Sequence, residues 1–164
     1  MFGAQLIFIP KILLAIIKTE ANKMRPYESG GVLMGVSLGR KNVLLTNVVG
    51  PGPTARHERF NFEPDYLYQE AEISRLYAQS GGTSLYLGDW HSHPGGTGAL
   101  SNMDKSALQR IAEHLPAQCR RPMMLIVSGG PDWDIALWQL VSHRYSHAEF
   151  KLTDEPDKST YRDI

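Results

Sequence analysis

Apolar residues recur along the chain with two spacings, which predict strands separated by helices. Alternating or continuous apolar runs predict seven strands, at residues 5–9, 31–39, 42–50, 83–93, 121–130, 132–141 and 143–152. Helical spacing predicts three helices, at residues 10–22, 65–80 and 101–115. The strands at 31–39 and 42–50 are close enough to form a hairpin. This order of elements predicts an α/β fold in which a mixed β-sheet is flanked by helices.

The same spacing predicts which helix faces lie in the core. In the second helix the predicted face holds Leu67, Ala71 and Leu76. In the third helix it holds Met103, Ala107, Leu108, Ile111 and Leu115. The segment 51–64 is rich in proline and arginine, lacks either spacing, and is expected to be a long irregular loop.

Length and composition favour one globular domain. The chain has 164 residues, of which 42% are hydrophobic and 21% charged, and we expect a single domain over 1–152 with a polar tail over 153–164. Seventeen basic residues balance seventeen acidic ones, so no nucleic-acid partner is expected. Pro10 and Lys11 interrupt the first apolar run, which argues against a signal peptide or membrane contact and favours a cytoplasmic protein. The single cysteine, Cys119, excludes a disulfide framework and a cysteine-rich zinc site.

The stretch "GDWHSHPGGTGALSNMD", residues 88–104, holds the candidate chemistry. Alternate residues of a strand point to one face, so His91 and His93 can ligate one metal ion together. Ten residues lie between His93 and Asp104, and the glycine-rich loop can bring this carboxylate back to complete a three-ligand site with one open position. Ser101 and Asp104 also form a helix-capping pattern, and the capping and metal-binding interpretations are compatible.

These residues resemble the motif of the JAMM (MPN+/JAB) metalloproteases, which hydrolyse isopeptide or peptide bonds next to ubiquitin-like proteins. The "HSHP" tetrad, the spacing to Asp104 and the serine three residues before it all match, and "YESGGVLMG" supplies the upstream glutamate of the motif, Glu28. The resemblance covers roughly residues 5–150. It implies a JAMM/MPN fold, which is similar to that of the cytidine deaminases, and a zinc-dependent enzyme.

The resemblance also implies a role for each matching position. His91, His93 and Asp104 would hold zinc, Glu28 would be the general base, and Ser101 would donate a hydrogen bond to the oxyanion of the tetrahedral intermediate. Asp89 has two interpretations. It is either a partner of a ligand histidine or an ordinary carboxylate on the surface at the end of a strand.

The expected partner is the C-terminal tail of a ubiquitin-like protein or of a conjugated CD-NTase-type cyclase. The chain is most similar to bacterial stand-alone members, in particular the deconjugating isopeptidases of CBASS anti-phage operons. Alternatives are a deconjugase of a bacterial ubiquitin-like protein outside CBASS, processing of sulfur-carrier proteins, and a non-catalytic MPN-type binding module. The loop from Arg56 to Arg59 either contacts the partner or is simply solvated. A zinc nucleobase deaminase is excluded, because that site needs two cysteines.

Overall fold

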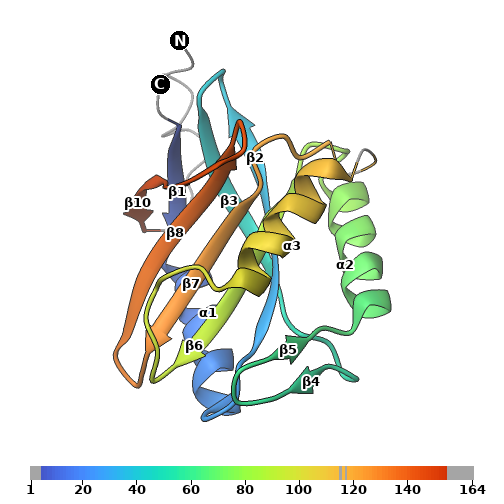
Figure 1. Ribbon diagram of the computed structural model, residues 1–164. Coiled ribbons are helices and arrows are strands. Elements are labelled where there is room, and N and C mark those ends of the chain that lie inside the picture. The colour runs from blue at the N-terminus through green and yellow to red at the C-terminus, as the bar shows by residue number, and fades with distance from the viewer. Residues whose placement is uncertain (1–4, 115, 117, 155–164) are drawn as a thin grey trace.

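The computed structural model describes residues 5–114, 116 and 118–154, and its largest feature is an eight-stranded mixed sheet with helices on both faces (Figure 1). The strands of this sheet are β1 (Leu6–Pro10), β2 (Gly30–Leu38), β3 (Asn42–Val49), β6 (Leu85–Pro94), β7 (Met123–Gly129), β8 (Trp133–Val141), β9 (Arg144–His147) and β10 (Glu149–Thr153). The helices are α1 (Lys11–Met24), α2 (Tyr66–Gln79) and α3 (Asn102–Glu113). The predicted fold class and the β2–β3 hairpin are confirmed.

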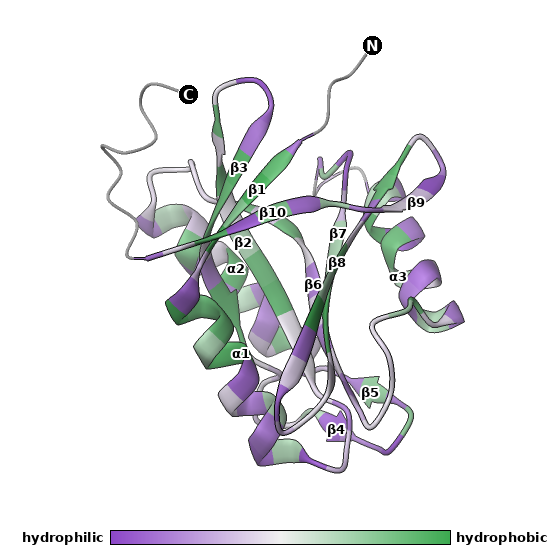
Figure 2. Ribbon diagram, turned by 90° about the vertical axis from the view of Figure 1, so that its left-hand side faces the viewer, coloured by the Kyte–Doolittle hydropathy of each residue, from purple (hydrophilic) through white to green (hydrophobic). Residues whose placement is uncertain are grey.

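The sheet curls until its two ends are joined by one run of chain. Its strand order is β10-β1-β3-β2-β6-β7-β8-β9, so β9 and β10 lie at opposite ends although only Ala148 separates them. β9 pairs antiparallel with β8, and β10 pairs in parallel with β1. Figure 2 shows this run crossing from β8 to β1. The prediction of one strand over 143–152 is therefore wrong, since that segment forms two strands at opposite edges of the sheet.

The helices divide the core into layers. α1 covers one face, where Leu14 and Ile17 pack with Trp90 and other buried residues of the sheet. α2 and α3 lie side by side on the opposite face (Figure 1), where Leu76 packs against Val32 and Leu108 against Met124. None of the helices among the described residues is long and apolar enough to cross a membrane.

Some sequence expectations about α2, α3 and the C-terminal tail need correction or stay open. On α2, Leu76 is buried as predicted, but Leu67 is 81% exposed, Ala71 is exposed as well, and Gln69 is buried in their place. On α3, Leu108 is buried as predicted, but Met103 is 56% exposed. Leu115 and the tail from residue 155 lie outside the described residues, so the predicted boundary after residue 152 stays a prediction.

The segment 51–64 is more ordered than predicted. It contains a two-stranded hairpin, β4 (Arg56–His57) and β5 (Phe62–Glu63), in which Arg56 pairs with Glu63. Such short strands show no apolar alternation, which is why the sequence pattern predicted only a loop.

Candidate metal centre

Strand β6 brings the two histidines to the face covered by α2 and α3. Gly88 has a φ of +138°, and the register between β2 and β6 shifts just before it. A Cβ at this position would lie 2.0 Å from the Met123 carbonyl oxygen, so the bulge requires glycine. Beyond the bulge, Trp90 points into the core beneath α1, and His91 and His93 point to the other face.

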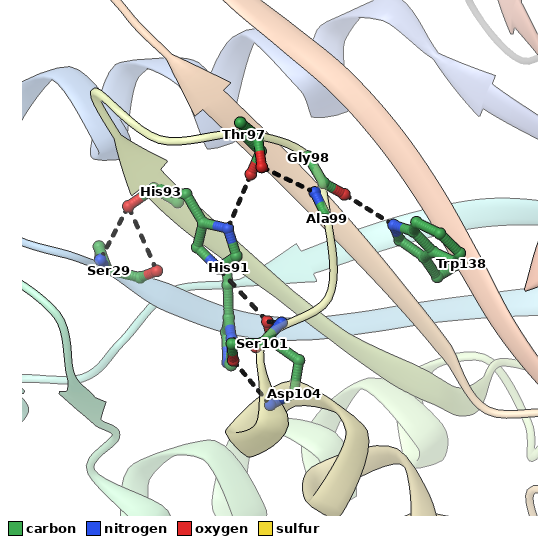
Figure 3. A network of polar contacts seen from close by, with 10 residues as sticks. Ser29, His91, His93, Thr97, Gly98, Ala99, Ser101, Asp104 and Trp138 are labelled. Atoms are coloured by element: carbon green, nitrogen blue, oxygen red, sulfur yellow. Dashed lines mark hydrogen bonds and ion pairs between the residues drawn. The ribbon is translucent and has the colours of Figure 1, made fainter. Parts of the chain in front are cut away.

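The loop after β6 folds back and delivers Asp104 to the histidines, as predicted. The Trp138 indole N–H donates to the Gly98 carbonyl at 2.7 Å and fixes the middle of this loop (Figure 3). Ser101 then caps α3, because its Oγ accepts from the Asp104 amide at 3.1 Å and its own amide donates to Asp104 Oδ2 at 2.8 Å. The capping interpretation is confirmed, and the same box orients the Asp104 carboxylate.

His91, His93 and Asp104 form one cluster of ligand atoms. A set of these atoms, one per residue, lies within 4.8 Å of one another. Asp104 Oδ1 is 2.7 Å from His91 Nδ1, and Oδ2 is 3.4 Å from His93 Nε2. Two imidazoles and a carboxylate are ligands that suit a divalent transition metal, and a cation bound between these groups would replace the direct contacts.

A further contact prepares His93 for coordination. Its Nδ1 lies 3.0 Å from the Thr97 carbonyl oxygen, which accepts a hydrogen bond from the Nδ1–H tautomer (Figure 3). Nε2 then keeps its lone pair and faces Asp104. Histidines that bind metals usually donate a hydrogen bond from one ring nitrogen and use the other as the ligand. The hydrogen bonding of His93 therefore fits a metal ion, as do the residue types of the cluster.

Electrostatics within the cluster favour a charged carboxylate. Burial by itself would raise the pKa of Asp104, but hydrogen bonds with His91 and His93 outweigh it and hold the pKa well below its usual range. Burial by itself would lower the pKa of His93, yet contacts with Asp104 and the Thr97 carbonyl raise it. A charged Asp104 carboxylate is the form that a metal cation would bind.

Glu28 enters the site from the chain just before β2. Its amide donates to the Glu58 carbonyl at 2.8 Å, which fixes its backbone. Burial raises the pKa of Glu28, and the nearby His93 and His91 partly counter this effect. The close approach of β2 needs glycine at position 30, where a Cβ would lie 2.6 Å from the His91 ring. A half-buried carboxylate with a raised pKa is suited to accept and return a proton.

The hairpin β4–β5 is part of the site, which sequence reasoning missed. His57 Nδ1 lies 2.9 Å from the Glu28 carbonyl oxygen, so its N–H can donate there. Phe62 lies between two rings, with its centroid 5.4 Å from that of His57 and 5.9 Å from that of His91. The His57 side chain therefore connects the hairpin to the segment that carries Glu28. Arg56 and Arg59 remain largely solvated, with Arg59 lying over Phe60.

Asp89 has a different environment from either sequence interpretation. Its Oδ1 accepts a 2.8 Å hydrogen bond from the Tyr86 hydroxyl, and burial raises its pKa. No hydrogen bond joins it to His91 within the described residues. Tyr86 and Asp89 share one face although they are three residues apart, because the bulge at Gly88 lies between them.

The double role of Ser101 can be tested directly. Ser101→Ala is expected to cost about 1 kcal/mol of stability by removing the helix cap. If the hydroxyl also stabilises an oxyanion, kcat should fall by roughly 10²- to 10³-fold. Thermal unfolding and cleavage rates measure the two effects. Ser101→Thr should recover both, whereas Ser101→Asp, which caps without a hydroxyl donor, should recover stability only. Full activity in Ser101→Asp would contradict the oxyanion role.

Comparison with known proteins agrees with this geometry. Residues 10–141 match the family described as prokaryotic homologs of the JAB domain. A probable metalloprotease y4qB from Sinorhizobium fredii is 33% identical over 129 residues, which is 78% of this chain and 79% of that protein. A CD-NTase/cGAS isopeptidase from Escherichia coli is 25% identical over 132 residues, 80% of each chain. The solved structure of protein DSY2949 from Desulfitobacterium hafniense has a TM-score of 0.71, with 93% of this chain and 96% of that one covered. At 19% identity, this last likeness shows the fold alone.

Proposed function

This chain belongs to the prokaryotic JAB-domain family, and from that membership we propose that it is a zinc-dependent isopeptidase. The family match and the names of the relatives agree with the sequence prediction of a JAMM metalloprotease. The observation that carries the proposal is the cluster of His91, His93 and Asp104, with Glu28 within electrostatic reach of both histidines. His91, His93 and Asp104 would hold the metal ion.

Zinc is the metal that this ligand set favours. Three nitrogen and oxygen ligands leave a tetrahedral ion with one open position, which is typical of catalytic rather than structural zinc. When bound, such an ion supplies Lewis acidity that activates water and polarises a carbonyl group. The buried Asp104 carboxylate and the Thr97 contact of His93 support this assignment, because both orient ligand atoms.

We assign proton transfer in the reaction to Glu28. Its carboxylate would accept a proton as the water oxygen attacks the scissile carbonyl carbon. As the carbon–nitrogen bond breaks, the protonated Glu28 would give that proton to the leaving amine, so that one water is consumed and an acid and an amine are released. The Ser101 hydroxyl would donate to the carbonyl oxygen while it carries negative charge.

For the substrate, we propose the C-terminal tail of a ubiquitin-like protein or of a conjugated CD-NTase-type cyclase, joined to an amine. One relative is named a CD-NTase/cGAS isopeptidase, which favours a conjugated cyclase and reversal of conjugation in an anti-phage system. A deconjugase acting outside such systems would share the same chemistry and differ only in the protein that carries the tail.

The proposal predicts metal-dependent cleavage of a tail fusion. A cyclase and a ubiquitin-like protein, each fused through its C-terminus to a reporter, are incubated with the enzyme and followed by intact mass. We expect release of the reporter at the last residue of one tail, complete loss of release with 1,10-phenanthroline, and recovery on adding zinc. The non-chelating 1,7-phenanthroline is the matched control. Cleavage that persists after chelation would contradict a metal-dependent mechanism.

A cysteine protease mechanism would be the obvious explanation of such chelator-resistant cleavage, and the structure disfavours it. Burial raises the pKa of the Cys119 thiol to about 12, and its Sγ lies 3.5 Å from the Leu87 carbonyl oxygen. A thiol with such a pKa supplies almost no thiolate at neutral pH. The non-catalytic binding module is the remaining alternative, and substitution of Glu28 separates it from an enzyme.

A further inference from the structure

A cleft of about 780 Å³ opens beside the metal centre, between α2, α3 and the sheet. Figure 1 shows the two helices side by side over this face, with β5 near one end. His91 lines the cleft, so the cleft is continuous with the metal-ligand cluster. A substrate bound at the cluster therefore has an adjoining space into which one of its side chains can extend.

Apolar side chains from three elements line part of this cleft, and polar and charged side chains line the rest. Val32, Ile73 and Ile111 line it from the sheet, α2 and α3. Asp89 lines it too, and Tyr86 donates to Oδ1. Within the described residues, no hydrogen bond reaches Asp89 Oδ2. A carboxylate with one open oxygen, next to apolar side chains, is suited to a side chain that has a long methylene stem and a cationic end.

The charges around the cleft agree with a cationic guest. Glu70 on α2 adds a second carboxylate to the lining, and Arg110 on α3 adds one guanidinium, which interacts with Asp89 electrostatically. Arg110 is exposed and forms no hydrogen bond or ion pair with Asp89 among the described residues. The open oxygen of Asp89 is thus available to a guest.

The spacing along β6 relates Asp89 to the residues of a substrate that would lie over this strand. Asp89 and His91 lie on the same face of one strand, two residues and about 7 Å apart. An extended substrate segment has the same spacing between alternate side chains. If the scissile carbonyl lies at the cluster of His91, His93 and Asp104 and the substrate runs in the direction of β6, the side chain two residues before it lies over Asp89.

We propose that the cleft between α2 and α3 is a specificity pocket for a lysine or arginine side chain, two residues before the residue that contributes the scissile carbonyl. Asp89 is the residue that binds its cationic end, and Tyr86 holds the carboxylate in place. This inference rests on the proposed function for its substrate, but the pocket itself is a property of the described residues.

The test compares the wild type with Asp89→Asn, which keeps an acceptor for Tyr86 but removes the charge. Labelled product-like peptides, which end at the free carboxylate and are not cleaved, carry either lysine or norleucine at the tested position. By fluorescence anisotropy, the wild type should bind the lysine peptide about tenfold more tightly or better. Asp89→Asn should bind the two equally. Glu72→Gln, which removes a carboxylate paired with Arg75 and lying outside the cleft, should keep the preference.

Cleavage of a randomised peptide library provides the second readout. Enrichment of basic residues at that position in the wild type, lost in Asp89→Asn, is expected. Cleavage without this enrichment, or with the same enrichment in Asp89→Asn, would overturn the pocket and leave the proposed function standing. If no peptide is cleaved but the lysine preference in binding is present and depends on Asp89, the proposed function fails and the pocket stands. A preference for acidic residues would assign the cleft to Arg110 and overturn the inference.

Discussion

Replacing His91 with alanine should leave the purified protein without bound metal and reduce cleavage to background. His91 is the proposed source of one ligand in a three-residue set, so its loss would leave only His93 and Asp104 to hold the ion. Elemental analysis of protein purified without added zinc should give about one zinc per chain in the wild type and almost none in the variant. Adding zinc should raise the unfolding temperature of metal-free wild type and leave that of His91→Ala unchanged, because a ligand stabilises only the state that binds it.

The matched control is another histidine outside the cluster. His143 lies in an exposed turn with a φ of +63°, where asparagine is tolerated, so His143→Asn should keep both the zinc and the thermal response. A wild type that holds no zinc after careful reconstitution would overturn the metal centre. Residues 88–104 would then be only a strand end followed by a capped helix.

Much of this site could be predicted from sequence because its parts lie in one short segment. A strand, a loop and a helix N-terminus follow each other between Gly88 and Asp104, and local rules determine the direction of each side chain. Glu28 lies far away in the sequence, and no spacing rule connects it to the histidines. It was found only through the resemblance, and the structure places it within their electrostatic influence.

The surroundings of the site could not be predicted, for a different physical reason. His57 and Phe62 reach the site through tertiary contacts of a hairpin that has no periodic pattern. Asp89 and Tyr86 share a face only because of the bulge at Gly88, and strict alternation would have placed them on opposite faces. Sequence periodicity does not reveal where a strand changes register.

Tertiary context also determined which faces of the helices are buried. Gln69 is buried on α2, where its side-chain amide donates to the Gly50 carbonyl at 3.1 Å, whereas Leu67 faces outward. The hydrophobic pattern predicted that Leu67 would be buried, because such a pattern takes no account of a hydrogen bond between a polar side chain and a neighbouring loop. Similarly, residues 143–152 divide into β9 and β10 because the sheet curls. The polar and apolar alternation continues through both strands, so the pattern predicted a single strand.

Replacing Glu28 with glutamine should separate catalysis from metal binding. The amide keeps the size of the side chain and cannot accept a proton, so cleavage should fall by roughly 10²- to 10⁴-fold, the usual contribution of a general acid–base group. Zinc content should stay at the wild-type level, because Glu28 is not one of the three clustered ligands. Single-turnover cleavage of the tail fusion, together with elemental analysis, measures both quantities.

The control for Glu28→Gln is Glu58→Gln on the adjoining hairpin. Glu58 is exposed, and only its backbone carbonyl contacts the Glu28 amide, so loss of its carboxylate should leave cleavage unchanged. Cleavage that survives in Glu28→Gln within about twofold would contradict the proton-transfer role, since a general base contributes far more than that. A wild type that binds tails and zinc but never cleaves would instead favour the binding module, in which Glu28 has no chemical task. The position of the half-buried Glu28 carboxylate beside His91 and His93 argues for the enzyme, because a module that only binds gains nothing from a desolvated carboxylate at this place.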